Sequence, residues 1–295
     1  MLRSALLALT LSALATVAVA QETVHFTSLD GTTNLTAYLR RPEGDGPRPA
    51  LVLMHGCSGL FNRNGRIFPL DQAWMRAVVQ GYVALTVDSA SPRGFGHTCT
   101  AGPERATMWR DRSKDAFAAL QYLQARPFVR ADRVGLMGWS QGGGVVLLSI
   151  NDKSIGRPSA LAHDFRAAVS FYPAVCSERL ESRPYTRVDP HSWTTLVPLL
   201  VLFGQADNWT LFPPCEAFIA AARARGNPVE LKSYAMAVHA FDAPNLPRTE
   251  RRRSDTVDRN GQGSPGRCFC AGAGISKTPS RSQLIRMPPC RSHSS

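Results

Sequence analysis

A serine between glycines joins an apolar run to a helix-compatible run, and this feature limits the folds open to the chain. Residues 138–143, Gly-Trp-Ser-Gln-Gly-Gly, follow the apolar run 134–137 and precede the apolar run 145–148. This order predicts a strand, a sharp turn and a helix, with Ser140 at the apex of the turn. The flanking glycines suit a crowded turn, because a Cβ there would collide with the facing backbone. The pattern favours a serine hydroxyl raised above a sheet, close to the first N–H groups of a helix.

The remainder of the chain alternates between strand-like and helix-like segments. Asp30-Gly31 lies between two short apolar runs and predicts an antiparallel N-terminal hairpin. Further strands are predicted over 50–54, 82–87, 134–139, 167–172, 197–203 and 229–234. Helices are predicted over 71–80, 107–126 and 215–225, each followed by glycine or proline. The alternation predicts a single α/β domain whose mainly parallel sheet has helices on both faces.

The two ends of the chain depart from this pattern. Arg3 precedes a stretch rich in leucine and alanine, and residues 18–20 have the small-x-small form of a signal-peptidase site. Residues 1–20 are therefore predicted to be a signal peptide, and the domain is expected over residues 21–248. Residues 249–295 lack apolar periodicity. They are interpreted either as a disordered basic tail or as a stretch translated in a shifted reading frame.

Export to the bacterial periplasm or out of the cell would allow disulfides to form. Four cysteines lie in the body of the chain, at Cys57, Cys99, Cys176 and Cys215, and they permit three pairings. Cys176 and Cys215 follow strands expected to be close in the sheet, and the other two lie in loops at one sheet edge. The pairs 176–215 and 57–99 are favoured, and buried free thiols are the alternative.

The net charge of +12 does not indicate a nucleic-acid partner. Residues 249–295 hold nine Lys/Arg and three Asp/Glu, which is half of that charge. The remainder has no basic helix and no basic patch interleaved with aromatic residues. No C-x-x-C pair or His/Cys cluster has zinc-ligand spacing, so no metal site is predicted. No segment after the signal peptide is long and apolar enough to predict a membrane span, and the oligomeric state stays open.

A serine nucleophile needs a base, a group that orients the base, and a site for the oxyanion. Asp207 follows the most apolar predicted strand, and His239 follows the last one. The order serine, acid, histidine matches hydrolases with this kind of turn, so Ser140, Asp207 and His239 are predicted to be catalytic. Asp242 is a weaker acid candidate because it is close to His239 in sequence, and Asp88 because it precedes the serine. A structural histidine is the alternative for His239.

Two backbone N–H groups would be needed to hold the oxyanion. One is predicted at Gln141, directly after the serine. The other is predicted at Cys57, within the segment 55–59, His-Gly-Cys-Ser-Gly, where glycines let the backbone approach a substrate. Cys57 is expected to have a structural role rather than to act as a nucleophile, because Ser140 already occupies the turn.

These residues together resemble the dienelactone hydrolase family of α/β-hydrolases. The resemblance rests on segment 55–59, Ser140, Asp207 and the segment 239–242, His-Ala-Phe-Asp, and extends over about residues 23–247. It implies an α/β-hydrolase fold and an enzyme that hydrolyses a small-molecule ester or lactone without a cofactor. The founding enzymes of the family use cysteine where this chain has serine, which favours a general carboxylic-ester or lactone hydrolase acting through an acyl-enzyme. Family members also end in a helix that the tail does not resemble.

The substrate contacts are less constrained by the sequence. Loop 88–94 is similar to the family's loop that shapes the substrate pocket, and Arg93 could pair there with a substrate carboxylate or act as a structural clamp. Trp139 and Trp209 flank triad members and could line the pocket or belong to the core. Two other functions stay open. One is a catalytically inactive product that exposes apolar surface for lack of the final helix, and the other is a serine peptidase of the same fold.

Overall fold

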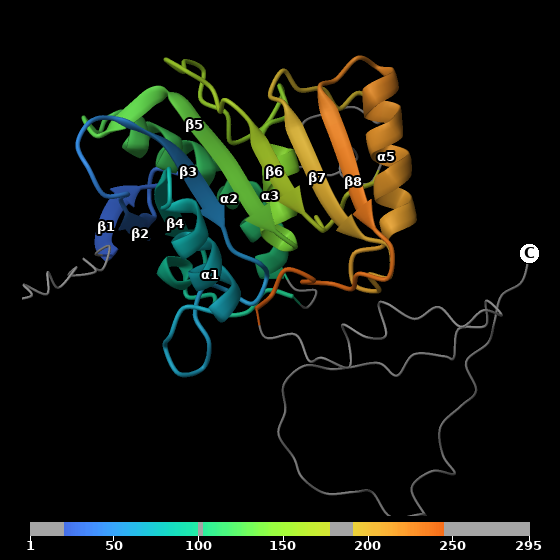
Figure 1. Cartoon of the computed structure of the whole chain (residues 1–295), viewed down its shortest axis with the longest axis horizontal. Coiled ribbons are helices and arrows are strands. Elements are labelled where there is room, and N and C mark those ends of the chain that lie inside the picture. Colours follow the sequence, from blue (N-terminus) through green and yellow to red (C-terminus); the bar gives the residue numbers. More distant parts are fainter. Residues whose placement is uncertain (1–20, 100–102, 178–190, 245–295) are drawn as a thin grey trace, which may run out of the picture. The chain divides into compact units, whose positions relative to one another are not determined.

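An eight-stranded sheet forms the frame of the computed structural model, which describes residues 21–99, 103–177 and 191–244 (Figure 1). The strand order is β1-β2-β4-β3-β5-β6-β7-β8. The strands are β1 (Gln21–Thr27), β2 (Asn34–Arg40), β3 (Arg48–Met54), β4 (Val83–Asp88), β5 (Val129–Trp139), β6 (Ala168–Phe171), β7 (Leu199–Gly204) and β8 (Val229–Tyr234). The expected signal peptide (1–20) and the expected tail (249–295) lie outside the described residues, so both stay predictions.

The pairing of the strands confirms the predicted fold. β1 and β2 form an antiparallel hairpin, and β2 also pairs antiparallel with β4. Every pair from β4 to β8 in the sheet is parallel. The central strand β4 is buried along its whole length, as expected for a strand covered on both faces.

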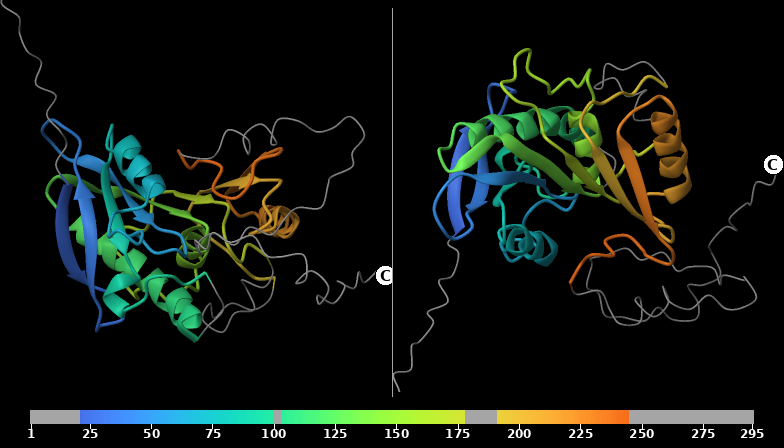
Figure 2. Two further views of the ribbon diagram at one scale, coloured as in Figure 1. Left: turned by 90° about the horizontal axis from the view of Figure 1, so that it is seen from below. Right: turned by 45° about the horizontal axis from the view of Figure 1, so that its top comes forward.

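Helices cover both faces of the sheet. They are α1 (Pro69–Val78), α2 (Pro103–Gln124), α3 (Gln141–Ser149) and α5 (Phe212–Ala224), with a short 3₁₀ helix η1 (Ser91–Arg93). Figure 2 shows α1 on one face and α2 and α3 together on the other. Every residue of α3 is buried, because this helix packs between the sheet and α2. Within the described ranges, no helix is both long and apolar enough to cross a membrane.

Three element starts differ clearly from the sequence prediction. α2 begins at Pro103 rather than at residue 107. α5 begins at Phe212 rather than at residue 215, because prolines at 213 and 214 fit the first helical turn, where a missing N–H breaks no bond. β5 begins at Val129 rather than at 134, because Val129 pairs with Arg48 before a shift in register. Most other boundaries agree within about two residues, which is the usual uncertainty of helix and strand ends.

The carboxyl ends of four parallel strands place the candidate residues at one edge of the sheet. Cys57 follows β3, Ser140 follows β5, Asp207 follows β7 and His239 follows β8. Parallel strands all end at the same edge, so residues far apart in the sequence converge there. This topology assembles a site from segments that are separated by up to 182 residues.

Candidate active site

The turn that carries Ser140 has a strained backbone. Ser140 has φ 54° and ψ −113°, and its N–H donates a hydrogen bond to the carbonyl of Phe171 at 3.0 Å. A Cβ on Gly142 would collide with the carbonyl oxygen of Met54, and one on Gly138 would collide with the backbone of Gly142. The two glycines therefore let β5, the turn and α3 pack closely enough to hold the serine at the apex.

Ser140, His239 and Asp207 form a continuous hydrogen-bonded chain. His239 Nε2 lies 3.0 Å from Ser140 Oγ, and His239 Nδ1 lies 2.7 Å from Asp207 Oδ2. Both distances are within hydrogen-bond reach of a base and the group that orients it. The structure thus brings together the three residues that the sequence predicts to be catalytic.

Asp207 is held by the loop that follows it. The N–H groups of Trp209 and Thr210 donate to Asp207 Oδ1 at 2.8 and 3.0 Å, and the Thr210 hydroxyl donates to Oδ2 at 2.8 Å. Burial tends to raise the pKa of Asp207, but the hydrogen bonds from His239 and from these N–H groups outweigh it and lower the pKa. An ionised Asp207 accepts the Nδ1 proton of His239 and leaves Nε2 as an acceptor for the serine.

The ring of His239 is packed between two aromatic side chains. Trp209 stacks on it with 5.3 Å between ring centroids and 19° between planes. Tyr172 meets the ring edge-on at 4.7 Å and 61°. These contacts restrict the imidazole to one orientation, which favours a short path between Nε2 and Ser140.

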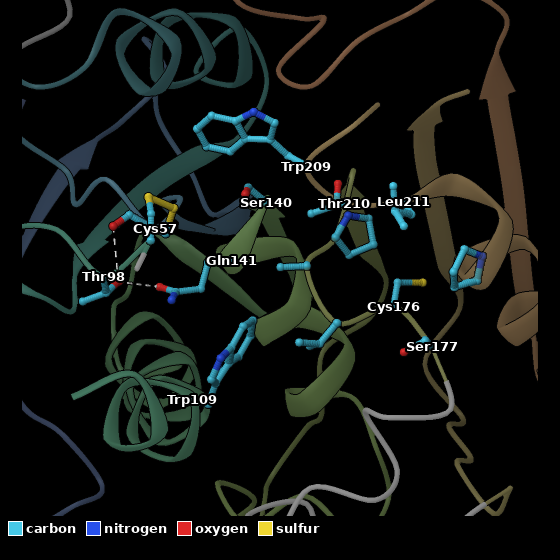
Figure 3. A pocket seen from close by; sticks show the side chains of 15 residues that line it. Cys57, Thr98, Trp109, Ser140, Gln141, Cys176, Ser177, Trp209, Thr210 and Leu211 are labelled. Carbon is cyan, nitrogen blue, oxygen red and sulfur yellow. Dashed lines mark hydrogen bonds between the residues drawn. A yellow bond between two sulfur atoms is a disulfide. The ribbon is translucent and has the colours of Figure 1, made fainter. Parts of the chain in front are cut away.

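The two predicted oxyanion donors lie beside Ser140, as Figure 3 shows for the side chains of Cys57 and Gln141. Among the described residues, neither backbone N–H has an acceptor. The carbonyl of Cys57 accepts a hydrogen bond from the N–H of Thr98 at 2.7 Å. The Thr98 hydroxyl lies 3.1 Å from the side-chain oxygen Oε1 of Gln141. Thr98 thus links the two segments that carry the candidate donors.

Arg112 provides a second link beneath the same segments. Its Nη1 donates to Gln141 Oε1 at 2.8 Å and its Nη2 to the carbonyl of His55 at 2.6 Å. Burial lowers the pKa of Arg112 to about 10, which still leaves the side chain charged near neutral pH. Burial and the Arg112 charge hold the pKa of His55 well below its usual value, so His55 is a neutral structural group.

Two disulfides border the site, and they are the pairs that the sequence analysis favours. Cys57 is bonded to Cys99 and Cys176 to Cys215, with Cα atoms 4.8 and 4.7 Å apart. The first bond ties the segment that carries one candidate donor to the loop before residue 100. The second joins the segment after β6 to the first turn of α5.

A pocket of about 300 Å³ opens beside Ser140 (Figure 3). In the figure, Cys57 and Gln141 lie on one side of Ser140, and Thr210 and Leu211 lie on the other. Most of its lining is apolar, with Trp109, Pro173, Ala174, Val175, Trp209, Leu211 and Pro214 contributing alongside both disulfides. Such a surface suits the uncharged parts of a small substrate. No cluster of His, Cys, Asp and Glu able to hold a metal occurs in the described part of the chain.

Arg93 has protein partners for its guanidinium group in the structure. Its guanidinium group is buried and donates to both carboxylate oxygens of Asp115, at 2.7 and 2.8 Å, and to Asp30 at 2.7 Å. A fourth bond reaches the carbonyl of Ser89 at 2.8 Å. These partners satisfy the group, so Arg93 is the structural clamp that the sequence analysis named as the alternative.

The two tryptophans considered for the pocket have different positions. Trp139 is buried in the core and donates its indole N–H to Asp242 at 2.9 Å. Trp209 lines the pocket, is 54 % exposed and stacks on His239. Only Trp209 therefore stays a candidate for contact with substrate.

Sequence reasoning missed Thr98, Arg112 and Thr210. None belongs to a recognisable motif, and each acts through partners set by the tertiary fold. Arg112 has one weak signal in the sequence, because it is a cation within a helix that carries a buried apolar face. No comparable pattern marks either threonine.

A mainly parallel sheet with a serine on the turn after β5, an acid after β7 and a histidine after β8 defines the class of α/β-hydrolases. Within that class, residues 35–259 match the dienelactone hydrolase family. The chain belongs to this family and is an enzyme that hydrolyses esters or lactones.

Relatives and solved structures agree with this membership. A Bradyrhizobium protein described as a probable 2-oxo-3-(5-oxofuran-2-ylidene)propanoate lactonase is 30 % identical over 210 residues, which are 70 % of this chain and 78 % of that protein. A probable dipeptidyl-aminopeptidase B of Fusarium vanettenii is 31 % identical over 162 residues, which are 51 % of this chain and only 17 % of that protein. The structure of esterase 2 from Thermogutta terrifontis superposes with a TM-score of 0.57 at 19 % identity, covering 79 % of this chain and 88 % of the esterase. This last similarity concerns the fold.

Proposed function

We propose that the protein hydrolyses small carboxylic esters or lactones through an acyl-enzyme formed on Ser140. The observation that carries this proposal is the hydrogen-bonded chain from Ser140 Oγ through His239 to Asp207, with links of 3.0 and 2.7 Å. The lactonase relative and the apolar pocket beside the serine support the substrate class. Apart from the substrate and one water, the proposed reaction uses only side chains and backbone groups of this chain.

In the first half of the reaction, His239 Nε2 takes the proton of Ser140 while Oγ attacks the acyl carbon. The carbonyl oxygen becomes an anion that accepts hydrogen bonds from the N–H groups of Cys57 and Gln141. Asp207 stabilises the imidazolium that has formed. Collapse of the tetrahedral intermediate breaks the bond to the alkoxide, which takes the proton from His239 and leaves as an alcohol.

In the second half, water attacks the acyl-enzyme and His239 takes one proton from that water. The acid then leaves, and the proton returns to Ser140 Oγ. Each oxyanion donor contributes about 2.7–4 kcal/mol to transition-state stabilisation in related chemistry. Thr98 and Arg112 would act by holding the two donor segments at a fixed separation.

The decisive experiment is the Ser140→Ala variant assayed on short p-nitrophenyl esters. Hydrolysis should fall by at least about 10³-fold, because the covalent step is lost. A fluorophosphonate probe should label the wild type and not this variant. Ser149→Ala is a matched control at the end of α3, the helix that follows Ser140, since among the described residues its hydroxyl donates to the carbonyl of Val145. Retained hydrolysis in Ser140→Ala would rule out the acyl-enzyme.

The same reagents separate the two other functions. A catalytically inactive product would express and fold but take up no fluorophosphonate label. A peptidase, favoured only by the similarity to dipeptidyl-aminopeptidases, would cleave dipeptide anilides as well as esters, whereas an esterase would cleave the esters alone. The hydrogen-bonded triad supports an active enzyme rather than an inactive product. The match to the peptidases is short, so it supports a peptidase less than the lactonase match supports an ester or lactone hydrolase.

We further infer that the protein is exported, and the two disulfides support this inference. Fractionation of cells that express the natural gene should place the protein outside the cytoplasm, with the four body cysteines unreactive toward thiol reagents. Recovery in the cytoplasm with free thiols would contradict it.

A further inference from the structure

We propose that Asp242 is a positioning residue, which fixes the loop that carries His239 against the segment that carries Ser140. This proposal rests on the function proposed above. Asp242 does not touch the imidazole in the manner of a triad acid, because Asp207 holds that position. Its carboxylate instead accepts hydrogen bonds from Trp74, Trp139 and Tyr172.

Three donors from three separate elements converge on this carboxylate. Oδ2 accepts the indole N–H of Trp74 at 2.7 Å and that of Trp139 at 2.9 Å, and Oδ1 accepts the hydroxyl of Tyr172 at 2.7 Å. These donors come from α1, the end of β5 and the segment just after β6. Hydrogen bonds to a charged acceptor are roughly twice as strong as neutral ones, so the loop is firmly attached at this point.

Two of the three attachments, those to Trp139 and Tyr172, lead directly to a residue of the triad. Trp139 immediately precedes Ser140, so the same carboxylate oxygen that holds the histidine loop also holds the serine turn. Tyr172, whose hydroxyl is bound to Asp242, presses its ring edge against His239 with 4.7 Å between centroids. Asp242 therefore sets the position of both partners in the 3.0 Å contact between Nε2 and Oγ.

The backbone of the loop gives independent support. Met236 has φ 64° and Ala240 has φ 58°, so residues on both sides of His239 adopt the left-handed region. Such conformations are unfavourable for residues other than glycine and persist only where surrounding contacts impose them. The three hydrogen bonds of Asp242 are placed to impose this conformation, since they anchor the loop two residues beyond Ala240.

The chemistry of the site calls for a carboxylate. Three donors need three acceptor positions, and a carboxylate offers about four, all without a donor of its own. An asparagine at position 242 could keep its oxygen toward the two indoles, but its NH₂ group would then face the Tyr172 hydroxyl, which would have to accept instead of donate. The side chain would keep its size but lose the charge that strengthens all three hydrogen bonds.

The test compares Asp242→Asn, Tyr172→Phe and Asp242→Glu with the wild type on a short p-nitrophenyl ester. For Asp242→Asn, kcat should fall about 10–100-fold with KM changed less than about threefold, because misplacement of the base affects the chemical step. Tyr172→Phe, which removes one of the three donors, should lower kcat by about threefold. Asp242→Glu, which restores a carboxylate, should recover part of the loss.

A control variant separates an effect on the position of His239 from an effect on the stability of the fold. Asp164→Asn removes the 2.8 Å ion pair with Arg157, far from the site, and should lower the melting temperature while leaving kcat of the folded fraction unchanged. The low-field proton NMR signal of the His239–Asp207 hydrogen bond should persist in Asp164→Asn and should broaden or vanish in Asp242→Asn. Unchanged kcat and an unchanged signal in Asp242→Asn and Tyr172→Phe would overturn the proposal. A wild type that neither hydrolyses esters nor takes up fluorophosphonate would instead refute the proposed function, and the NMR comparison would still decide the role of Asp242.

Discussion

Positive backbone φ angles mark the residues around the pocket. Ser140 has φ 54° and Val175 has φ 58°, and both line the pocket. The turn geometry explains Ser140, because the serine must stand clear of the sheet. Val175 is a β-branched residue, for which this region is especially unfavourable. Its conformation places a branched side chain on the pocket wall, next to the disulfide of Cys176.

Val175 is therefore expected to limit the size of the acyl or alcohol group. Val175→Gly and Val175→Ala should both shift hydrolysis toward longer p-nitrophenyl esters. The glycine variant should also be more stable than the alanine variant by about 1 kcal/mol, because only glycine adopts this φ freely. Chain-length profiles and urea unfolding measure the two effects. If Val175→Gly were less stable than Val175→Ala, backbone strain at this position would be contradicted.

Individual site residues could be predicted from the sequence where their order along the chain decides their position in the fold. Ser140, Asp207 and His239 could be predicted because each follows a parallel strand and such strands end at one edge. The partners of Arg93 could not, since Asp30 and Asp115 are 63 and 22 residues away along the chain. Asp242 was set aside as the triad acid because of its place in the sequence, and nothing in the local sequence indicates its three distant donors.

Helix α2 connects the two segments that carry the candidate oxyanion donors. Through Arg112 it reaches both the carbonyl of His55, next to the segment of Cys57, and the side chain of Gln141 at the start of α3. The planar guanidinium group can serve two acceptors at once with fixed geometry. One side chain thereby sets the separation of the two candidate oxyanion donors.

The variant Arg112→Lys should keep the buried charge but lose one of the two contacts, because an ammonium group cannot span both acceptors. We expect kcat/KM to fall about tenfold or more, since a misplaced oxyanion donor acts on the transition state. Arg157→Lys, at a site remote from the pocket, is the matched control. Ester kinetics that match the wild type in Arg112→Lys would show that the donors are held by other means.

At the element scale, strands and helices followed the hydrophobic pattern closely. Apolar runs such as β4 and β7 are visible in the sequence because they are buried by helices. Helix starts were less certain, as the two prolines in the first turn of α5 show. Prolines often end a helix, and only the N-terminal position makes them compatible with one.

On the scale of the whole molecule, the polar groups inside the fold make its stability depend on pH. Asp71, on α1, is buried, and burial raises its pKa from 3.8 to about 7. The nearby negative charge of Asp242 adds to this effect, whereas Arg112 opposes it. A carboxyl group with a raised pKa binds its proton more tightly in the folded state, so stability falls as pH rises from about 4 to about 7.

Asp71→Asn should remove this dependence. The variant and the wild type should have similar unfolding free energies near pH 4, where both side chains are neutral. Near pH 8 the variant should be more stable than the wild type, by at most about 4 kcal/mol. Urea unfolding at the two pH values measures the difference. An equal difference at both values would show that Asp71 is not the group responsible.

The exposed indole of Trp209 is stacked on His239, so its fluorescence should report whether the imidazole is protonated. In the proposed cycle the imidazole becomes a cation each time it holds the serine proton. A cationic ring in van der Waals contact accepts an electron from an excited indole far more readily than a neutral one does. Emission from Trp209 should therefore dim while the proton is on the base and recover when it leaves. Subtraction of the Trp209→Phe signal would isolate this emission, so turnover could be followed in real time without a dye or a chromogenic substrate.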